Sequence, residues 1–192
     1  MSHNSQYQPL RNQFVAGDNL PTISTQLDSV RTYQFECQFF GIPNAANGPS
    51  LTTAAKQVSP VGGATDDIVV DRVNDKMFYP GKFTPEAVTI TFDNQLLTNT
   101  TPELWNWFKN TYNPTTGDVA ALAPPANPGG GGLKANKLRI MELDNNNQPF
   151  ASIELYGVYP QGITFSEKNY STNEFSTVEV VFRYDFIGYE QY

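Results

Sequence analysis

Apolar and polar residues alternate along several segments of this chain, and the alternation predicts β-strands. Successive side chains of a strand point to opposite faces, so an alternating segment has one buried face and one wet face. The cleanest case spans residues 32–40, where the apolar positions are Tyr33, Phe35, Cys37 and Phe39. Further strands are predicted at residues 67–73, 76–79, 87–93, 136–144 and 150–156, with turns at 74–75 and 80–82.

The carboxyl-terminal segment contains the longest alternating run. It follows the predicted hairpin of residues 136–144 and 150–156, then residues 157–160 and a polar turn region rich in Asn and Ser. We expect one face of this last strand to be buried, with Val178, Val180, Phe182, Tyr184 and Phe186. The residues between them, from Thr177 to Asp185, form a mostly wet face.

A single helix is predicted, from residue 101 to about residue 112. Thr101 supplies a hydroxyl N-cap, Pro102 fits the first helical position, and Glu103 lies near the positive end of the helix dipole. The Asn-Pro pair at 113–114 ends the helix.

Two tryptophans of this helix are separated by one residue. Because residues two apart on a helix differ by about 200 degrees, Trp105 and Trp107 face opposite sides. We expect Trp105 to pack beneath the helix with Leu104 and Phe108, and Trp107 to lie near a surface or a subunit contact. An aromatic platform for a sugar or a base is the less favoured interpretation.

The segments together predict one mainly β domain over residues 31–192, built as two packed antiparallel sheets in a sandwich or barrel with one flanking short α-helix. Residues 1–30 are polar without sustained periodicity and predict a flexible amino-terminal arm. Two loop insertions are predicted, at 44–64 and at 115–135. The second contains a proline- and glycine-rich stretch that cannot pack and lacks the Gly-Lys-Ser/Thr ending of a phosphate-binding loop.

Composition narrows the function. The formal net charge is −7, and the 12 Lys and Arg residues are scattered, which argues against a general nucleic-acid binder. Charged residues make up 16% of the chain, below the usual quarter, while aromatic residues reach 13%, a profile that favours strands and loops. No apolar run is long enough for a spanning helix, and the amino terminus does not resemble a signal peptide, so we expect a soluble chain that folds in a cytoplasm.

Candidate catalytic and metal-binding groups are few. His3 is the only histidine and Cys37 the only cysteine, which disfavours a Ser-His-Asp triad, a disulfide framework and a cysteine- or histidine-based metal site. Asp66 and Asp67 are neighbours that face opposite ways in a strand. Four glutamates are assigned to the wet faces of strands: Glu154, Glu167, Glu174 and Glu179. We therefore expect no enzyme activity, no cofactor and no metal.

Residues 31–189 resemble the tail tube protein of contractile-tailed bacteriophages, which is related to the tube-forming protein of type VI secretion systems. The resemblance depends on an ordered set of segments: 72–82, 88–93, 103–109, 153–160 and 170–175. It implies a structural virion protein with no catalytic residues. Six subunits would form a ring whose inner sheets join edge to edge around a lumen, and rings would stack head to tail into the inner tube, the conduit for genome ejection.

The resemblance also implies partners and a location. These are further copies of the chain, the tail sheath, the baseplate hub and the tail terminator protein, in a virion assembled in the host cytoplasm, with no membrane contact. We expect the 44–64 loop to lock one ring to the next, and a lumen of uncharged polar and acidic side chains through which DNA passes without specific binding. The candidate subunit contacts are Asn74, Tyr79, Trp107, Tyr156, Tyr170, Glu179, Arg183 and Asp185.

Two alternatives stay open. A baseplate hub or tube-initiator subunit of the same fold would contain the same strands. A carbohydrate-binding β-sandwich would use Trp107 and exposed tyrosines. An enzyme is a third choice with no residues to assign.

Overall fold

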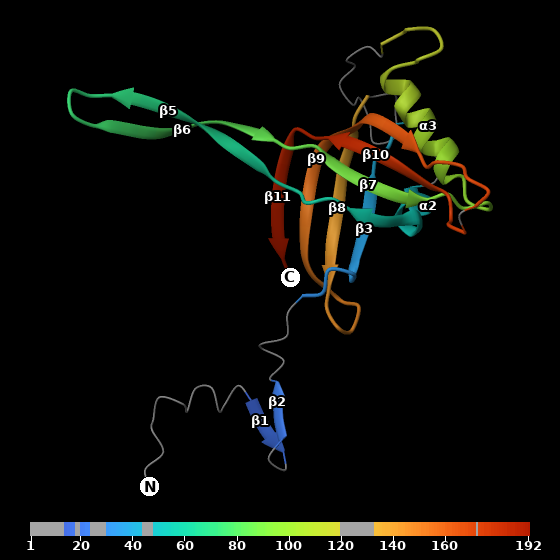
Figure 1. Cartoon of the computed structure of the whole chain (residues 1–192), viewed down its shortest axis with the longest axis horizontal. Coiled ribbons are helices and arrows are strands. Elements are labelled where there is room, and N and C mark those ends of the chain that lie inside the picture. Colours follow the sequence, from blue (N-terminus) through green and yellow to red (C-terminus); the bar gives the residue numbers. More distant parts are fainter. Residues whose placement is uncertain (1–13, 18–19, 24–29, 44–47, 120–132, 172) are drawn as a thin grey trace.

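A computed structural model describes residues 14–17, 20–23, 30–43, 48–119, 133–171 and 173–192. It confirms the predicted mainly β fold with antiparallel sheets, and its described residues contain two helices where one was predicted (Figure 1). The strands are β1 (Phe14–Gly17), β2 (Leu20–Ile23), β3 (Phe35–Phe40), β4 (Ala55–Val58), β5 (Gly63–Asp71), β6 (Lys76–Pro85), β7 (Val88–Asp93), β8 (Ala135–Leu143), β9 (Pro149–Phe165), β10 (Thr177–Arg183) and β11 (Phe186–Gln191). The helices are α2 (Gly48–Ala54) and α3 (Thr100–Thr111).

Two sheets share the long strand β9. The first sheet has the order β3-β8-β9-β11 and uses residues 149–158 of β9. The second sheet uses residues 159–165 of β9 and continues through β10, β7 and β4. The strands of the second sheet cross those of the first at a steep angle (Figure 1). The result is a sandwich whose layers are joined by a continuous strand, and not a barrel closed within one chain.

The chain bends between the two sheets at Gly157 and at the junction of β10 with β11. Gly157 has a φ of 67°, a conformation that costs little only for glycine. The opposing bend contains Asp185, whose N–H donates to the carbonyl of Tyr156 at 2.8 Å. Lys134 Nζ pairs with both carboxylate oxygens of Asp185, at 2.7 and 2.8 Å. A register shift between Val181 and Phe182 completes the change of direction.

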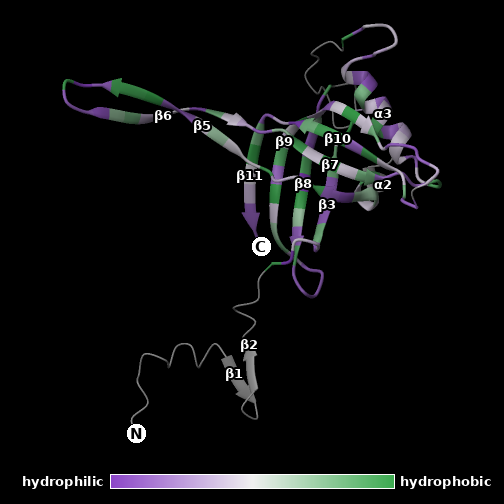
Figure 2. Ribbon diagram, in the orientation of Figure 1, coloured by the Kyte–Doolittle hydropathy of each residue, from purple (hydrophilic) through white to green (hydrophobic). Residues whose placement is uncertain are grey.

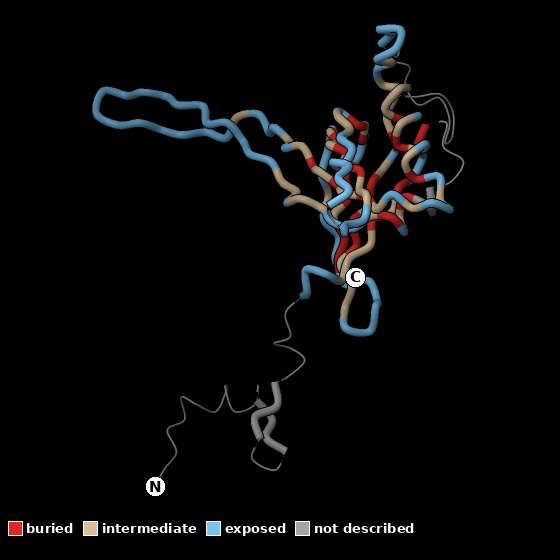
Figure 3. Tube along the Cα trace, turned by 45° about the vertical axis from the view of Figure 1, so that its right-hand side comes forward, coloured by how far each residue is buried: buried red, intermediate tan, exposed pale blue. Residues whose placement is uncertain are grey.

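An aromatic cluster between the sheets forms the centre of the core. The cluster consists of Phe39, Phe92, Trp107 and Phe182. Five of its ring pairs have centroids between 5.4 and 6.4 Å apart, in the tilted and edge-on arrangements that aromatic rings prefer. Figure 3 shows the buried residues gathered between the crossing layers. Cys37 is buried as predicted, and burial raises the pKa of its thiol to about 12.

The predicted roles of the two tryptophans are reversed. Trp107 is 1% exposed and packs in the core, whereas Trp105 is half-buried against Phe108 and Phe165. The reason is the choice of helix face: Thr100, Leu104 and Trp107 follow the spacing of four and three residues that marks one side of a helix, and that side faces the core. The expectation that Trp107 lies at a surface or subunit contact is therefore wrong.

The predicted loop at 44–64 contains regular structure over its described part. In α2, Leu51 and Ala54 are buried in the core, and β4 pairs with β7 at the edge of the second sheet. This helix was not predicted, because its residues are mostly short and polar and its apolar positions are too few to produce a clear helical period. Residues 44–47 lie outside the described residues.

Three further strand boundaries differ from the predictions. Residues 80–82 continue β6 instead of forming a turn, since β5 and β6 accommodate them with a register shift near Asp66. β9 runs through residues 157–160 to Phe165. Phe186 is 71% exposed, because the bend at Asp185 moves it out of the face that Val178 and Phe182 share.

Parts of the predicted terminal arm and proline-rich loop lie outside the description. Within residues 1–30, the described strands β1 and β2 form an antiparallel hairpin. Of the predicted 115–135 loop, residues 120–132 are outside the described residues.

Replacement of Gly157 by alanine tests the bend. The new Cβ would clash with Asp185 Oδ2, and alanine disfavours a φ of 67°. We expect G157A to lower the free energy of unfolding by about 1–3 kcal/mol, measured by chemical denaturation. The matched control is Gly162→Ala in the same strand, where a Cβ meets nothing within 4 Å. Equal stability of the two variants would contradict the role given to Gly157.

Candidate functional site

One face of the first sheet is free of the core. Directly opposed residues of antiparallel strands share a face, so the registers define rows across the four strands. Three rows on the open face read Phe40-Lys137-Tyr156-Phe186, Gln38-Arg139-Glu154-Gly188 and Glu36-Met141-Ser152-Glu190. The opposite face carries Cys37, Leu138 and Leu155 into the core. Figure 2 shows this mixture of hydrophilic and hydrophobic positions along each strand.

A buried carboxylate lies at the centre of the open face. Glu154 is 2% exposed, and its Oε1 accepts hydrogen bonds from Lys137 Nζ at 2.8 Å and from Arg139 Nε at 2.8 Å. Arg139 Nη2 lies 2.7 Å from the same oxygen. The hydroxyl of Tyr156 donates to Oε2. The prediction that Glu154 belongs to a wet strand face was right about the face and wrong about its exposure.

These contacts fix the charge of Glu154. Burial alone would raise the pKa of this carboxyl group, but the hydrogen bonds from Lys137, Tyr156 and Arg139 outweigh it and lower the pKa to about 2. The carboxylate therefore stays ionised across the ordinary pH range. Its charge is matched locally by two cations.

Aromatic rings cover the two cations. Lys137 Nζ lies 5.5 Å from the ring centre of Phe40 and 5.8 Å from that of Tyr156, and the guanidinium of Arg139 lies 5.7 Å from Phe40. Such contacts attract a cation to the face of a ring. The side chains of Lys137 and Arg139 are only 23% and 26% exposed as a result of these combined contacts.

The outer strands of the first sheet have open edges within the described residues. The N–H of Leu143 donates to the carbonyl of Gln34, and that of Tyr192 to the carbonyl of Phe150, each at 3.0 Å. Backbone groups alternate sides along an antiparallel strand, so these two bonds set which residues face outward. Phe35, Cys37 and Phe39 face outward on β3, and Ile187, Tyr189 and Gln191 on β11.

The β5–β6 hairpin forms an arm that projects from the body on the side of β11 (Figure 1). All of β5 and most of β6 are exposed, which Figure 3 shows as a long exposed loop of chain. Apolar side chains occupy both faces of the arm: Ile68, Val69, Val70, Met77, Phe78 and Tyr79. A two-stranded ribbon is at best marginally stable alone in water, so an arm of this composition favours contact with another surface.

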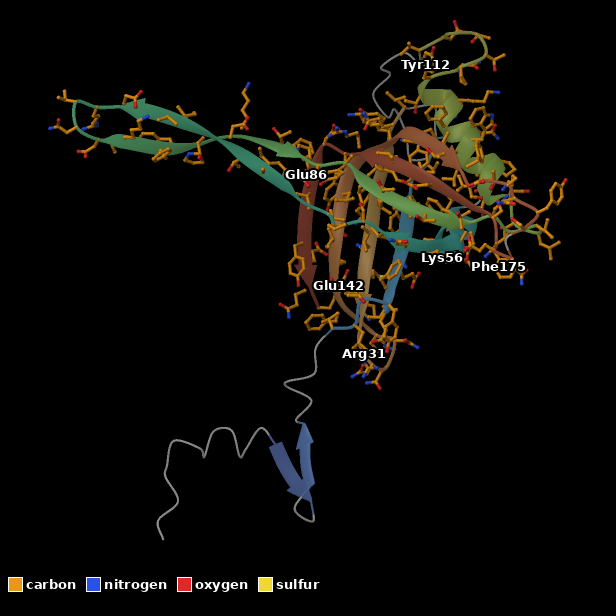
Figure 4. All side chains as sticks on the ribbon, viewed as in Figure 1. Arg31, Lys56, Glu86, Tyr112, Glu142 and Phe175 are labelled. Atoms are coloured by element: carbon orange, nitrogen blue, oxygen red, sulfur yellow. The ribbon has the colours of Figure 1, made fainter. Side chains whose placement is uncertain are left out.

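Hydrogen bonds fix the arm at its root. The carbonyl of Gly62 accepts from the N–H of Glu86 at 3.0 Å and from the hydroxyl of Tyr184 at 2.6 Å. Arg183 donates to the carbonyl of Pro85 at 3.2 Å. Figure 4 labels Glu86 at this junction of arm and body. The arm therefore leaves the core in a defined direction.

The predicted subunit contacts fall in several places. Asn74 and Tyr79 lie on the arm. Tyr156 lies on the open face, and its carbonyl accepts from the N–H of Asp185, which lies at the bend. Arg183 donates its hydrogen bond at the root of the arm. Of the remaining three, Trp107 is buried in the core, whereas Tyr170, in the loop after β9, and Glu179, on β10, are exposed. Their contacts with another copy stay predictions. The prediction missed Glu154 as a buried centre and its two cationic partners, and it did not say which strands form the open edges.

Other kinds of site find little support in the described part of the chain. It contains no group of three or more His, Cys, Asp and Glu residues placed to hold a metal ion. Neither of its helices is both long and apolar enough to cross a membrane.

Comparison with known proteins finds solved structures that have a similar fold. No family model and no curated sequence matches the chain. Among solved structures, a chain of the PVC sheath-tube complex of an extracellular contractile injection system, in its extended state, has a TM-score of 0.66 at 14% identity, covering 89% of this chain and 100% of that one. The tube-terminating cap of the anti-feeding prophage gives 0.63 at 13% identity, with coverage of 92% and 100%. The SPP1 tail tube gives 0.56 at 10% identity, with coverage of 85% and 80%. The chain thus shares the fold of tube proteins, as the resemblance in the sequence predicted.

The contacts of Glu154 predict that the free energy of unfolding falls as the solution becomes acidic. The pKa of Glu154 is about 2 in the fold and 4.5 ordinarily, so its contribution is present above about pH 4.5 and is lost as pH falls toward 2. We expect Glu154→Gln to flatten this part of a plot of unfolding free energy against pH. Glu190→Gln on the same face is the control and should retain the wild-type slope. Identical slopes for wild type and E154Q would contradict the paired state of Glu154.

Proposed function

We propose that this chain is a structural tube subunit: its copies join through the edges of β3 and β11 into closed rings, and the rings stack into a hollow tube. The observation that carries the proposal is the four-stranded antiparallel sheet with two open outer strands. The shared fold with contractile injection system and tail tube structures supports it.

The topology of the first sheet suits closure. Because the sheet has four antiparallel strands, β11 of one copy and β3 of the next run in opposite directions, and the alternation continues across the join. Both strands have six residues, and each directs three residues' backbone groups outward. Ring closure would satisfy these groups and remove edges that otherwise promote aggregation.

The open face would line the lumen. The second sheet and the helices α2 and α3 lie on the core side of the first sheet. Bulk on one side of a curved sheet fits on the outside of a cylinder, where there is more room. Six copies would contribute 24 strands, which at about 4.8 Å per strand gives a perimeter of at least roughly 115 Å and a diameter of at least about 37 Å, because strand tilt widens a closed barrel. Barrels with fewer strands already enclose an aqueous channel.

The arm replaces the 44–64 segment as the proposed contact between rings. α2 and β4 are part of the packed body, whereas the arm is exposed and apolar on both faces. An arm that leaves each copy in the same direction makes a head-to-tail contact, which propagates into a filament. The tail sheath, baseplate hub and tail terminator are the proposed further partners.

The proposed role is passive: the tube serves as the conduit for genome ejection in a contractile phage tail, within a virion assembled in the host cytoplasm. A hub or tube-initiator subunit of the same fold differs in copy number and is the alternative. The alternative of a carbohydrate-binding sandwich is disfavoured, because Trp107, the main aromatic platform it would need, is buried.

Tyr189→Pro tests edge closure. Proline removes an N–H that faces away from β9, so the ladder within the subunit stays intact while pairing with β3 of a second copy is blocked. We expect Y189P to remain a folded monomer where the wild type forms rings, judged by circular dichroism, sedimentation and negative-stain microscopy. The control is Tyr189→Ala, which loses the same side chain but retains the N–H and should form rings. If Y189P still assembles into rings, the proposal that β11 pairs with β3 of a second copy is wrong.

Removal of the arm tests stacking. Residues 67–80 can be replaced by a two-residue Asn-Gly turn, because the backbones of Asp66 and Gly81 are adjacent. We expect this variant to form single rings without rods under the microscope, since the edges of the first sheet are untouched. Asp71→Asn is the control: it removes only an exposed ion pair with Lys76, and rods should persist. Rods of normal length from the shortened chain would assign stacking to another surface.

A further inference from the structure

The open face holds two cations at its centre, although it would line a conduit for a polyanion. Lys137 and Arg139 lie in adjacent rows on β8, two residues apart on the same face. Lysine and arginine side chains are the groups that bind phosphate in nucleic acids, and repeated around a ring they would form a continuous adhesive belt. A tube lined in this way would retain the molecule that passes through it.

We propose that Glu154 is the residue that determines this property: it occupies both cations and so prevents the conduit from holding the phosphates of its cargo. The inference rests on the proposed function, because it takes the open face as the lumen. Glu154 acts through Lys137 and Arg139 and is therefore a positioning residue for the lumen's charge.

The geometry supports occupation of both cations by one carboxylate. Oε1 of Glu154 lies within 2.8 Å of Lys137 Nζ and of two nitrogens of Arg139. A phosphate oxygen would have to displace a carboxylate that is already seated, held on its other oxygen by the hydroxyl of Tyr156. The rings of Phe40 and Tyr156 restrict access to the cations further.

Nearby carboxylates add negative charge to the open face but do not contact the two cations. Glu36 and Glu190 lie in the next row, on the two outer strands, so three carboxylates face two cations in these rows. Glu36 accepts a hydrogen bond from Gln38, and Glu190 attracts Arg139 only through a longer-range coulombic interaction, whereas Glu154 contacts both cations directly. Position, and not only net charge, thus distinguishes Glu154.

Binding of a short fluorescein-labelled single-stranded DNA tests the proposal. At low salt we expect Glu154→Gln rings to retain the DNA about ten-fold more tightly than wild-type rings, with an affinity that falls steeply as salt rises. The matched control is Glu190→Gln, which removes the same formal charge from the same face but leaves both cations occupied. It should stay within about two-fold of wild type. Equal retention by E154Q and E190Q would overturn the proposal in favour of net charge alone.

Single removal of a cation gives a second test that does not depend on the folding of E154Q. If Lys137 is already occupied, Lys137→Gln in the otherwise natural chain should leave DNA retention unchanged within about two-fold. A larger loss would show that Lys137 is available to phosphate and would overturn the proposal. Circular dichroism on each variant separates a loss of fold, which a purely structural role of Glu154 would produce, from a change in DNA retention.

Microscopy of the same samples keeps the two proposals apart. Wild-type rings together with E154Q rings that do not retain DNA would remove the inference and leave the tube function intact. A wild-type chain that forms no rings at high concentration, with its tail partners present, would remove the tube function itself.

Discussion

Strand β9 belongs to two crossing sheets, and the arrangement of the molecule depends on how it does so. A 17-residue strand cannot lie flat in both layers, so it bends at a glycine with positive φ, where the side chain of Asp185 fills the space that a Cβ would need. The bend sends β10 into the second sheet and β11 back along the first. This leaves β11 and β3 as the outer strands and sets one face of the first sheet free of the core.

Alternation along the chain was enough to predict strands wherever burial differs between faces. β3 and β7 begin and end within three residues of the prediction, and Cys37, Val178 and Phe182 are buried as expected. The pattern fails where geometry changes within a strand. Phe186 continues the apolar period in the sequence, but a bend resets which face it occupies, and no local signal marks that bend apart from Gly157 on a different strand.

The candidate site was harder to predict because it depends on register. Pairing of β8 with β9 places Arg139 opposite Glu154 and Lys137 opposite Tyr156, and the hairpin itself was predicted. A shift by one residue would send both cations to the core, so only the register decides whether the charges meet. Trp107 shows the same limit for a helix: its spacing from Thr100 and Leu104 defines the buried face, yet the apolar period of Leu104, Phe108 and Tyr112 is equally regular in the sequence.

Stability alone does not explain a buried carboxylate on an open sheet face. Replacing buried ion pairs by packed apolar residues is often neutral or stabilising, so the fold does not require this one. An apolar replacement is nevertheless excluded for a face in water, because a continuous hydrophobic patch would bind other surfaces. Exposed cations would bind polyanions, and exposed carboxylates alone, repeated around a ring, would repel one another across the seams. A carboxylate shared between two cations gives a polar surface of low adhesion without that repulsion, which is the combination that the proposed conduit needs.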